Sequence, residues 1–588
     1  MAGRHASSQG ERVITRTATE QRSDLLRRLG EMKLERASWM AHWQELSTFI
    51  LPRNGRYFVQ DRNRGNRRHN AIYDNTGTRA AGVLAAGLMA NMTSPARPWF
   101  RLETPDKELN EHQPVREWLA DVTQLMLDVF AKSNTYRALH HSYKELGVFG
   151  TEASITMDDF ETVIHHNSLT TGEFCIATNY KGQVDTLARE FEKTVSEVVR
   201  EFGYKNCSVA VRNLFDRGAL GQWVPITHII EPRADRDPSS KLASQMAWRD
   251  CYFETGASAE FVLRDGGFKT FPALVSRWDV AGGDIYGNSP GQETLGDIKQ
   301  LQQEQWRKAQ AIDYMTKPPL QAPTSMKNAE VEMLPGGISY YDGTTPGAGI
   351  RSAFNVTLDL NHLLEDIRDV RERVKSGFYA DLWLALEQID QGKMTAYEVA
   401  ERKEEKLLLL GPTSERLHSE KLSPLIEGTF ARMLRAGIVP PAPEEMHGMD
   451  LNVNFISMLA QAQRAIGTNN IDRFVGNLGQ IATFKPGVLD NFDEDQWVTE
   501  YSDMLGIAPT LIVASDKVAL IRKARAQQAQ AVQQAGLANS AADTAQKLGG
   551  ASTSPDTALG ALSQGAGATL AAGAGPGQGP TAGTTGYS

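Results

Sequence analysis

The stretch Ser289-Pro290-Gly291-Gln292 opens the segment that decides the fold, and Pro318-Pro319 closes it. A serine cap, a proline at the first helical position and a glutamine that can complete a capping box together predict a helix start. The proline pair then stops the helix. Between them, apolar residues recur at helical spacing: Leu295, Ile298, Leu301, Trp306, Ala309 and Ile312.

A second helical stripe lies within residues 357–377, after a segment, 318–356, that is rich in Pro, Gly and turn residues. Its apolar members are Leu360, Leu363, Leu364, Ile367, Val370, Val374 and Phe378. Each helix spans roughly 20–27 residues, or roughly 30–40 Å at ~1.5 Å per residue. The pattern predicts a two-helix stalk with a small module at its tip, suited to packing beside copies of the same chain. An ordinary helical hairpin inside a globular domain is the alternative.

Length and charge set the broad class. A chain of 588 residues is too long for one core, so we expect two to four domains. The 62 basic and 71 acidic residues give a net charge of −9, which argues against a protein that coats nucleic acid tightly. A mildly acidic protein can still handle DNA if its role is to let DNA slide.

The cysteines and the apolar windows exclude other classes. Cys175, Cys207 and Cys251 are odd in number, widely spaced and without a C-x-x-C pair, so neither a disulfide framework nor a zinc site is expected. Residues 1–28 lack the apolar core of a signal peptide. The most apolar window, 80–92, is too short to span a bilayer, so we expect no transmembrane segment.

The remaining pattern indicates an α+β protein, mainly helical, rather than a regular βαβ array. Helices are expected at 20–50, 78–91, 114–132, 136–146, 184–202, from Thr395 to about 410, 414–436 and 514–548. Strands are expected at 154–157, 163–166, 173–180, 223–231, 245–254 and 271–278. Short helices with loops fit 444–510. Residues 1–19 and the Gly-rich residues from 549 onward are expected to be disordered.

No nucleotide-binding signature is present, since the sequence contains neither a P-loop nor a G-x-G-x-x-G motif at a helix start. Residues 287–291 do read G-x-S-x-G, the spacing of a hydrolase nucleophile. That mechanism uses the backbone N–H of the residue after the serine, and here that residue is Pro290, which has none. We therefore interpret Ser289 as a helix cap.

Metal-dependent catalysis has little support either. The clusters Asp158-Asp159, Asp235-x-Asp237 and Asp493-Glu494-Asp495 lie in expected turns, where Asp bonds its own backbone. The pairs His140-His141 and His165-His166 are neighbours whose side chains point apart. We expect no catalytic, cofactor-binding or metal-binding residues. A metal-dependent nuclease remains the alternative of a different class.

A basic loop runs from Arg53 to His69, with Tyr57 and Phe58 nearby. Its candidate phosphate-contacting residues are Arg62, Arg64, Arg67 and Arg68. A solvated loop, or pairing with acidic neighbours in an assembly, accounts for the same charges and is the favoured interpretation.

A series of short motifs occurs along the chain in a fixed order. They are Tyr73-Asp74-Asn75-Thr76-Gly77, Met92-Thr93-Ser94-Pro95, Arg97-Pro98-Trp99-Phe100, Val184-Asp185-Thr186 with Arg189-Glu190-Phe191, Tyr286-Gly287-x-Ser289-Pro290-Gly291, Asp297-Ile298-Lys299, Pro318-Pro319, Pro335-Gly336-Gly337 and Met394-Thr395-Ala396-x-Glu398-Val399. Over about residues 20–510 the chain resembles the portal proteins of short-tailed phages, also called head-to-tail connectors.

The resemblance implies a structural ring, most commonly of twelve subunits, at one vertex of the capsid. The ring would form the channel for genome packaging and ejection and the site of tail attachment. Implied partners are double-stranded DNA passing through without sequence preference, a terminase motor, capsid and scaffolding proteins, and tail adaptors. The implied location is the virion, assembled in the bacterial cytoplasm, with no membrane. A different ring-shaped tail adaptor is a further alternative, beside a metal-dependent nuclease or other phage-encoded enzyme.

The resemblance also implies named parts. They are a wing at 20–285, stem helices at 286–317 and 357–377, a clip at 318–356, a tunnel loop at 378–394, further wing and crown at 395–510, and an inward-facing helical barrel at 511–548 if the protein has one. Candidate partner-facing residues of the clip are Lys327, Glu330 and Glu332.

Candidate channel residues in the tunnel loop are Glu387, Gln388, Asp390, Gln391 and Lys393. With Asp381, they place several acidic or neutral groups beside one cation. Because binding to DNA strengthens with each phosphate that Lys or Arg neutralises, such a loop would let the duplex slide.

Overall fold

The computed structural model describes residues 18–60, 70–106, 109–110, 112–257, 262–317, 320–321, 327, 351–352, 361–383, 410–446, 448, 451–456, 474–481, 484–485, 487, 492–505, 513 and 515–549. The chain divides into two compact units, Met1–Pro509 and Thr510–Ser588. The second unit contains α18 (Ser515–Gly549), the Ala- and Gln-rich helix expected from the sequence. No helix within the described ranges is both long and apolar enough to cross a membrane.

Four helices of the first unit confirm the sequence pattern, with ends shifted by a few residues. They are α1 (Ala18–Phe49), α2 (Thr76–Met92), α4 (Gln113–Lys132) and α5 (Thr135–Phe149). Helix α2 is rich in Gly and Ala, and these small side chains let its neighbours come close. At its contact with α5, a Cβ added to Gly147 would lie 2.7 Å from a methyl carbon of Leu84. Ala18 and Thr19, expected to be disordered, belong to α1.

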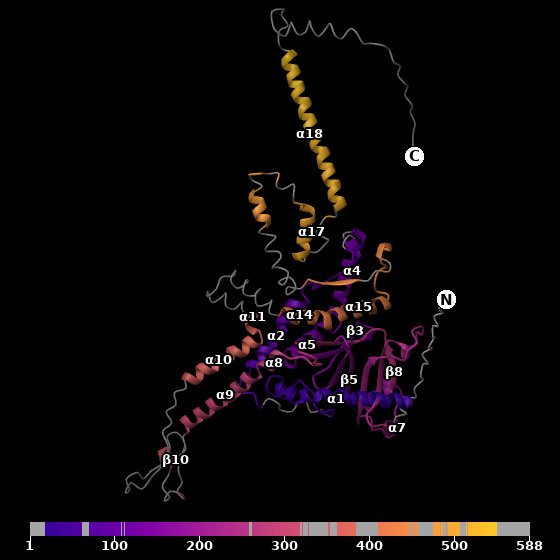
Figure 1. Ribbon diagram of the computed structural model, residues 1–588, viewed down its shortest axis with the longest axis vertical. Coiled ribbons are helices and arrows are strands. Elements are labelled where there is room, and N and C mark those ends of the chain that lie inside the picture. Colours follow the sequence, from indigo (N-terminus) through magenta and orange to yellow (C-terminus); the bar gives the residue numbers. More distant parts are fainter. Residues whose placement is uncertain are drawn as a thin grey trace, which may run out of the picture. The chain divides into compact units, whose positions relative to one another are not determined.

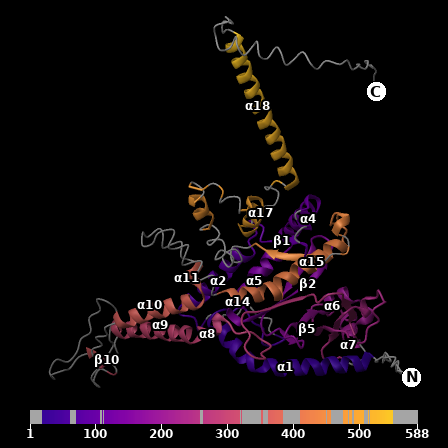
Figure 2. The same cartoon turned by 45° about the horizontal axis from the view of Figure 1, so that its top comes forward.

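Two antiparallel sheets follow. One has the order β3-β2-β9 and the other β4-β5-β6-β7-β8. Their bounds are β2 (Thr151–Asp159), β3 (Val163–Ser168), β4 (Phe174–Thr178), β5 (Val184–Thr194), β6 (Trp223–Pro232), β7 (Trp248–Glu254), β8 (Arg264–Phe268) and β9 (Ala273–Arg277). Helix α1 packs Leu25, Leu29 and Met32 on one face of the five-stranded sheet (Figures 1 and 2). Helices α6 (Val195–Phe202) and α7 (Val209–Asp216) pack on the other face.

The expected helix over 184–202 is wrong in its first part. Residues Val184–Thr194 form the strand β5, and only Val195–Phe202 are helical. Leu, Ala, Arg, Glu and Lys favour a helix there locally, but β5 is hydrogen-bonded between β4 and β6 and largely buried, so tertiary pairing overrides propensity. The true helix start carries its own signal, because Thr194 and Glu197 form a complete capping box.

Several short elements were not expected from the sequence. Strand β1 (Phe100–Glu103) pairs with β12 (Asn452–Phe455), which joins segments far apart in the chain. The strand β8 contains Gly266-Gly267, which weakens any strand pattern. Short 3-10 turns occur at Tyr204–Asn206, Ala243–Gln245 and Glu444–Met446. The pairings of β1 and β8 depend on partner strands that lie outside any short window of the sequence.

The two-helix stalk is present. Its first arm is α8 (Pro290–Glu293) followed by α9 (Leu295–Thr316), and its second is α10 (Asn361–Gly377). Helices α9 and α10 lie side by side, and the short strands β10 (Leu320–Gln321) and β11 (Arg351–Ser352) pair near their far ends (Figure 1). The first arm is one helix in the sequence pattern but is interrupted at Thr294 in the structure.

The described residues after the stalk are mainly helical. A short helix α11 (Ala380–Trp383) follows α10, and later come α14 (Gly411–Leu417), a π-helical turn (His418–Leu422), α15 (Ser423–Arg435) and α17 (Glu494–Leu505). Pro412 sits in the first turn of α14, a position that suits proline. The helix expected from Thr395 to about 410 lies outside the described residues.

Candidate channel-forming site

The apolar stripes of α9 and α10 face each other where the pair joins the rest of the chain. Leu295, Ile298 and Leu301 of α9 are buried, as are Ile367, Val370 and Val374 of α10. All six belong to the main hydrophobic cluster of the first unit. Burying six such side chains stabilises by about 1.5–3 kcal/mol each before entropy losses. This half of the seam confirms the sequence prediction.

The far half of α9 is different. Trp306, Ile312, Tyr314 and Met315 are 45%, 41%, 48% and 46% exposed. Trp306 and Ile312 belong to the predicted stripe, so the stripe continues beyond the part that this chain itself covers. A run of exposed large apolar side chains along one helix is typical of a surface that a partner covers.

The side chain of Asp74 ties both arms of the stalk to the start of α2. Its Oδ2 accepts from Arg371 of α10 at 3.0 Å (Nε) and 2.7 Å (Nη2), and from Gln305 of α9 at 3.1 Å. Its Oδ1 accepts from the backbone and hydroxyl of Thr76 at 2.8 and 2.5 Å. Burial alone would raise the pKa of Asp74, but the bonds from Thr76 and Arg371 outweigh it and lower the pKa.

Gln302 of α9 completes this arrangement, which we call the Asp74 clasp (Asp74, Thr76, Gln302, Gln305 and Arg371). The Gln302 Oε1 accepts from the backbone N–H groups of residues 73 and 74 at 2.7 and 2.8 Å, and its Nε2 donates to the Asp74 carbonyl at 2.9 Å. One side chain thereby satisfies three backbone polar groups at residues 73 and 74, of which the two of Asp74 are buried.

Charge along the stalk is balanced. Helices α9 and α10 carry seven acidic and seven basic side chains between them. Arg373 of α10 lies 3.5 Å from Asp297 of α9 and 3.6 Å from Asp369, and Lys299 lies 2.6 Å from Glu45 of α1. A surface with no basic excess neutralises few phosphates, so it would hold DNA weakly.

One carboxyl group in the seam is buried in an unusual setting. Glu304 of α9 is 7% exposed, and its Oε1 accepts from Gln300 at 2.6 Å. Its neighbour across the seam is the carboxyl of Asp366. Burial raises the pKa of Glu304, and the charge and hydrogen bond of Asp366 raise it further. The protonated form of Glu304 is therefore favoured in the folded chain.

The chain turns sharply where α10 ends. Phe378 is buried, Tyr379 has a φ of 55°, and α11 follows at once. A positive φ at an aromatic residue is rare, so the surrounding packing holds this turn. Trp383, the last residue of α11, lies directly on Gly87 of α2, where an added Cβ would be 2.2–2.5 Å from three indole carbons.

Most residues that the sequence singled out lie outside the described part of the chain. These are Glu387, Gln388, Asp390, Gln391 and Lys393 of the tunnel loop, Glu330 and Glu332 of the clip, and Arg62, Arg64, Arg67 and Arg68 of the basic loop. Lys327 is described as an exposed turn residue. The roles given to all of them remain predictions.

The residues behind the catalytic alternatives have structural roles. Ser289 is fully buried; its hydroxyl accepts from the Gln292 N–H at 3.2 Å and donates to the Val148 carbonyl at 2.7 Å, so it is a helix cap. Asp158 pairs with Arg432 at 2.7 Å, and Asp493 accepts from backbone N–H groups at the start of α17. Within the described ranges no three His, Cys, Asp or Glu residues are placed to hold a metal.

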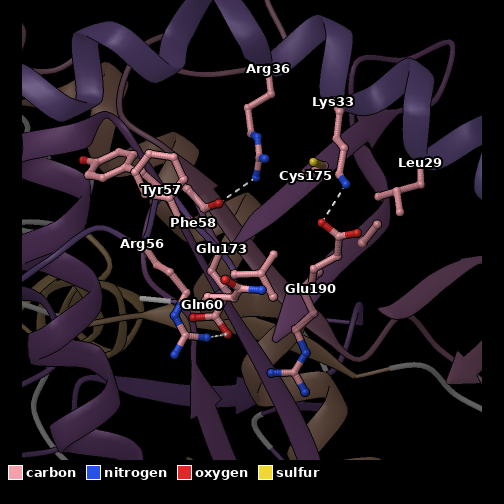
Figure 3. Close-up of a pocket in the computed structure, with 14 residues that line it drawn as sticks. Leu29, Lys33, Arg36, Arg56, Tyr57, Phe58, Gln60, Glu173, Cys175 and Glu190 are labelled. Carbon is pink, nitrogen blue, oxygen red and sulfur yellow. Dashed lines mark hydrogen bonds and ion pairs between the residues drawn. The ribbon is translucent and has the colours of Figure 1, made fainter. Parts of the chain in front are cut away.

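A cavity of about 440 Å³ lies between α1, residues 56–60 and the edge strand β4 (Figure 3). Its two carboxylates face cations: Glu190 lies 2.6 Å from Lys33 and Glu173 lies 3.6 Å from Arg56. Burial raises the pKa of the Cys175 thiol at its wall. Paired carboxylates and a protonated thiol make this lining a poor catalytic centre.

The motif Tyr73-Asp74-Asn75-Thr76-Gly77 contributes to the family resemblance, but the sequence indicates no role for its residues. The D-x-T spacing is a signal for a turn at a helix start, since Asp bonds the backbone two residues on. Nothing in the sequence indicates that Arg371, 297 residues away, is the partner of Asp74.

Comparison with known proteins places this architecture. Residues 22–513 match the family described as "Bacteriophage head to tail connecting protein". The probable portal protein of Bordetella phage BPP-1 is 61% identical over 539 residues, covering 92% of this chain and 97% of that protein. The portal protein of Salmonella phage epsilon15 is 42% identical over 552 residues, covering 94% and 99%.

A solved chain from the virion of a native gene transfer agent particle is similar over 79% of this chain and 99% of its own length. Its TM-score is 0.31 and its sequence identity 11%, a level that adds nothing to the assignment. The match over residues 22–513 and the two phage relatives, each covered almost end to end, decide the matter. The chain belongs to the bacteriophage head to tail connecting proteins.

Proposed function

We propose that this chain is a portal subunit: copies close into a ring at one vertex of a phage head, and the ring forms the passage for DNA and the attachment site for the tail. The chain acts as a structural component of the virion rather than as an enzyme. The portal proteins of the two phages named above support the proposal through their identity over nearly the whole chain.

One structural observation carries the ring. The apolar stripe of α9 is covered by α10 at one end and exposed from Trp306 to Met315 at the other. A closed ring of identical subunits gives each stalk a neighbour on both sides, which can cover such a stripe without leaving an open end. We propose twelve subunits, with α8, α9 and α10 as the stem, 318–356 as the clip, 378–394 as the tunnel loop and 511–548 as the barrel.

The proposed partners follow from the parts. The clip, with Lys327, Glu330 and Glu332, would meet the terminase motor during packaging and tail adaptors afterwards. The wing and crown would meet capsid and scaffolding proteins, and assembly would take place in the bacterial cytoplasm. Double-stranded DNA would pass through without sequence preference, because the balanced stem charges and the acidic tunnel loop neutralise few phosphates.

Ring formation is tested by electron microscopy and light scattering of the purified chain. Closed rings are expected for the natural sequence. Ile312→Glu, which places a charge on the exposed stripe, should shift the population toward subunits. Gln303→Glu adds the same charge at an exposed polar position of the same helix and should leave the rings intact. Monomers at assembly concentrations of the natural protein would contradict the proposal.

The tunnel-loop assignment has its own test. Lys393→Ala should leave ring formation unchanged and alter DNA packaging or retention in assembled particles. A variant that fails to fold would show that residue 393 lies in a core rather than in a channel.

The nuclease alternative predicts cleavage of DNA when Mg²⁺ or Mn²⁺ is added, and no cleavage is expected here. A ring-shaped tail adaptor differs from a portal in the assembly step that needs it: the adaptor is needed to attach the tail, whereas the portal is needed to fill the head. Particles lacking this chain would be full heads without tails if it were an adaptor, whereas heads lacking a portal would not fill with DNA.

A further inference from the structure

We infer that Asp74 is a positioning residue for the channel. Through the Asp74 clasp, helix α2 couples the paired helices α9 and α10 to α11, where the proposed tunnel loop begins. The inference rests on the proposed function for the role of that loop, and on the contacts alone for the coupling.

The first step is that the clasp holds both arms at one atom. Oδ2 of Asp74 receives Arg371 from α10 and Gln305 from α9, and its side chain is 5% exposed. Neither arm can slide along the other without removing a donor from this buried carboxylate. Leaving a buried charge without its donors is costly, so the two arms and residue 74 should move together.

The second step is that α2 is tightly packed both near the clasp and at α11. Near the clasp, a Cβ added to Gly77 would lie 3.1 Å from Cδ1 of Ile298 in α9. Farther along the same helix, Gly87 lies against the indole of Trp383 so closely that no side chain fits between them. Tightly packed contacts transmit small displacements because no void absorbs them.

The third step is that α10, α11 and α2 form a closed loop of contacts. Helix α10 continues through Phe378 and Tyr379 into α11, α11 contacts α2 through Trp383, and α2 returns to α10 through Asp74 and Arg371. The turn at Tyr379 is held in a left-handed conformation by its surroundings rather than by its own preference. A displacement of the stem therefore reaches α11 both along the chain and through α2.

Hydrogen exchange on the assembled ring tests the coupling. Asp74→Asn and Arg371→Gln should speed exchange in a peptide over 378–383 about tenfold, because its amides are held by local bonds such as Leu382 N–H to the Tyr379 carbonyl. Arg373→Gln is the matched control. Arg373 lies on the same helix with similar exposure, 46% against 41%, and pairs with Asp297 and Asp369 rather than Asp74.

The reverse experiment uses the other end of α2, because coupling between two sites is reciprocal. Gly87→Ala displaces Trp383 and should speed exchange at the amides of residues 73 and 74, which Gln302 holds. Gly82→Ala is its control, since a Cβ there meets nothing within 4 Å. If Asp74→Asn does not fold, Arg371→Gln and the Gly87 and Gly82 pair still decide the question.

Two results would overturn the inference. In the first, Arg373→Gln speeds hydrogen exchange at 378–383 as much as Arg371→Gln does. In the second, the variants at Asp74 and Arg371 leave exchange at 378–383 unchanged, and Gly87→Ala leaves exchange at residues 73 and 74 unchanged. Either can occur while natural rings form and package DNA, so the proposed function would stand. Conversely, a chain that forms no rings refutes the proposed function, while the same exchange measurements on the subunit still report on the coupling.

Discussion

The ammonium group of Lys421 is buried against the carboxylate of Glu152, with neither side chain more than 2% exposed. Lys421 also donates to Ser142 at 2.8 Å, and Ser276 donates to Glu152 at 2.6 Å. Burial lowers the pKa of Lys421, while Glu152 acts in the opposite direction. The pair joins the π-helical turn to β2, and Glu420, the preceding residue, joins the same turn to Arg277 of β9 at 2.6 Å. The π-helical turn is thus anchored to two strands of the three-stranded sheet.

We expect Lys421→Met to destabilise the subunit by about 3–5 kcal/mol, because it leaves the Glu152 charge buried without its partner. The double variant Lys421→Met, Glu152→Met removes both charges and should recover most of the loss. Lys299→Met breaks an exposed pair with Glu45 and should cost about 1 kcal/mol or less. Denaturant unfolding of the three variants measures the differences. Equal losses at Lys421 and Lys299 would contradict the role of burial.

Acid should destabilise the protein through His166. Burial, and then the charges of Lys421 and Arg432, lower the pKa of His166 to about 3. The unfolded chain therefore binds a proton that the folded chain does not, so stability is present above the ordinary pKa and is lost as pH falls from about 6.5 toward 3.

Between pH 7 and 5 this loss amounts to about 2 kcal/mol. His166→Asn should flatten the pH dependence of the unfolding midpoint, whereas His165→Asn at the exposed neighbouring position should not. Identical slopes for the two variants would show that His166 does not carry the acid sensitivity.

The stalk should respond to pH in the opposite direction. The pKa of Glu304 is raised by burial and by Asp366, and the other charged group facing it from α10 is Arg373, which lowers it. The folded chain retains a proton that the unfolded chain loses, so this stabilisation is complete below the ordinary pKa of Glu and is lost as pH rises through the raised value.

Glu304→Gln keeps a donor toward Asp366 without a charge. It should raise the melting temperature at pH 8 and remove that part of the slope. Glu365→Gln, at an exposed position of α10, is the control and should change little. A fall in melting temperature for Glu304→Gln at every pH would contradict a raised pKa of Glu304.

Two glycines near Thr294 should behave oppositely. A Cβ at Gly291 would lie 2.5 Å from the Val148 carbonyl oxygen and 2.8 Å from its Cα, so Gly291→Ala must displace backbone and should cost about 3 kcal/mol. A Cβ at Gly296 meets nothing within 4 Å, so Gly296→Ala should stabilise α9 by about 0.5–1 kcal/mol. Melting temperatures of the two variants check this contrast, and a similar effect of both would contradict the packing of α8 on α5.

Much of the fold followed from local patterns. The caps at Ser289, the apolar stripes of α9 and α10, and the small-residue helix α2 were all visible in the sequence. The family resemblance drawn from short motifs was confirmed by the match over residues 22–513. The strand β5 was missed because its residues favour a helix in isolation, and only hydrogen bonding to β4 and β6 makes it a strand.

The sequence by itself determined the Ser289 cap, the two stalk helices with their apolar stripes and the small-residue helix α2, because a cap or a 3.6-residue period acts within a few turns of one chain segment. Only the tertiary structure decided that Asp74 holds Arg371, that Trp383 lies on Gly87, and that Lys421 neutralises Glu152. Those partners are chosen by burial: a charged or bulky side chain must find its complement among segments far away in the chain, and no local preference specifies which one.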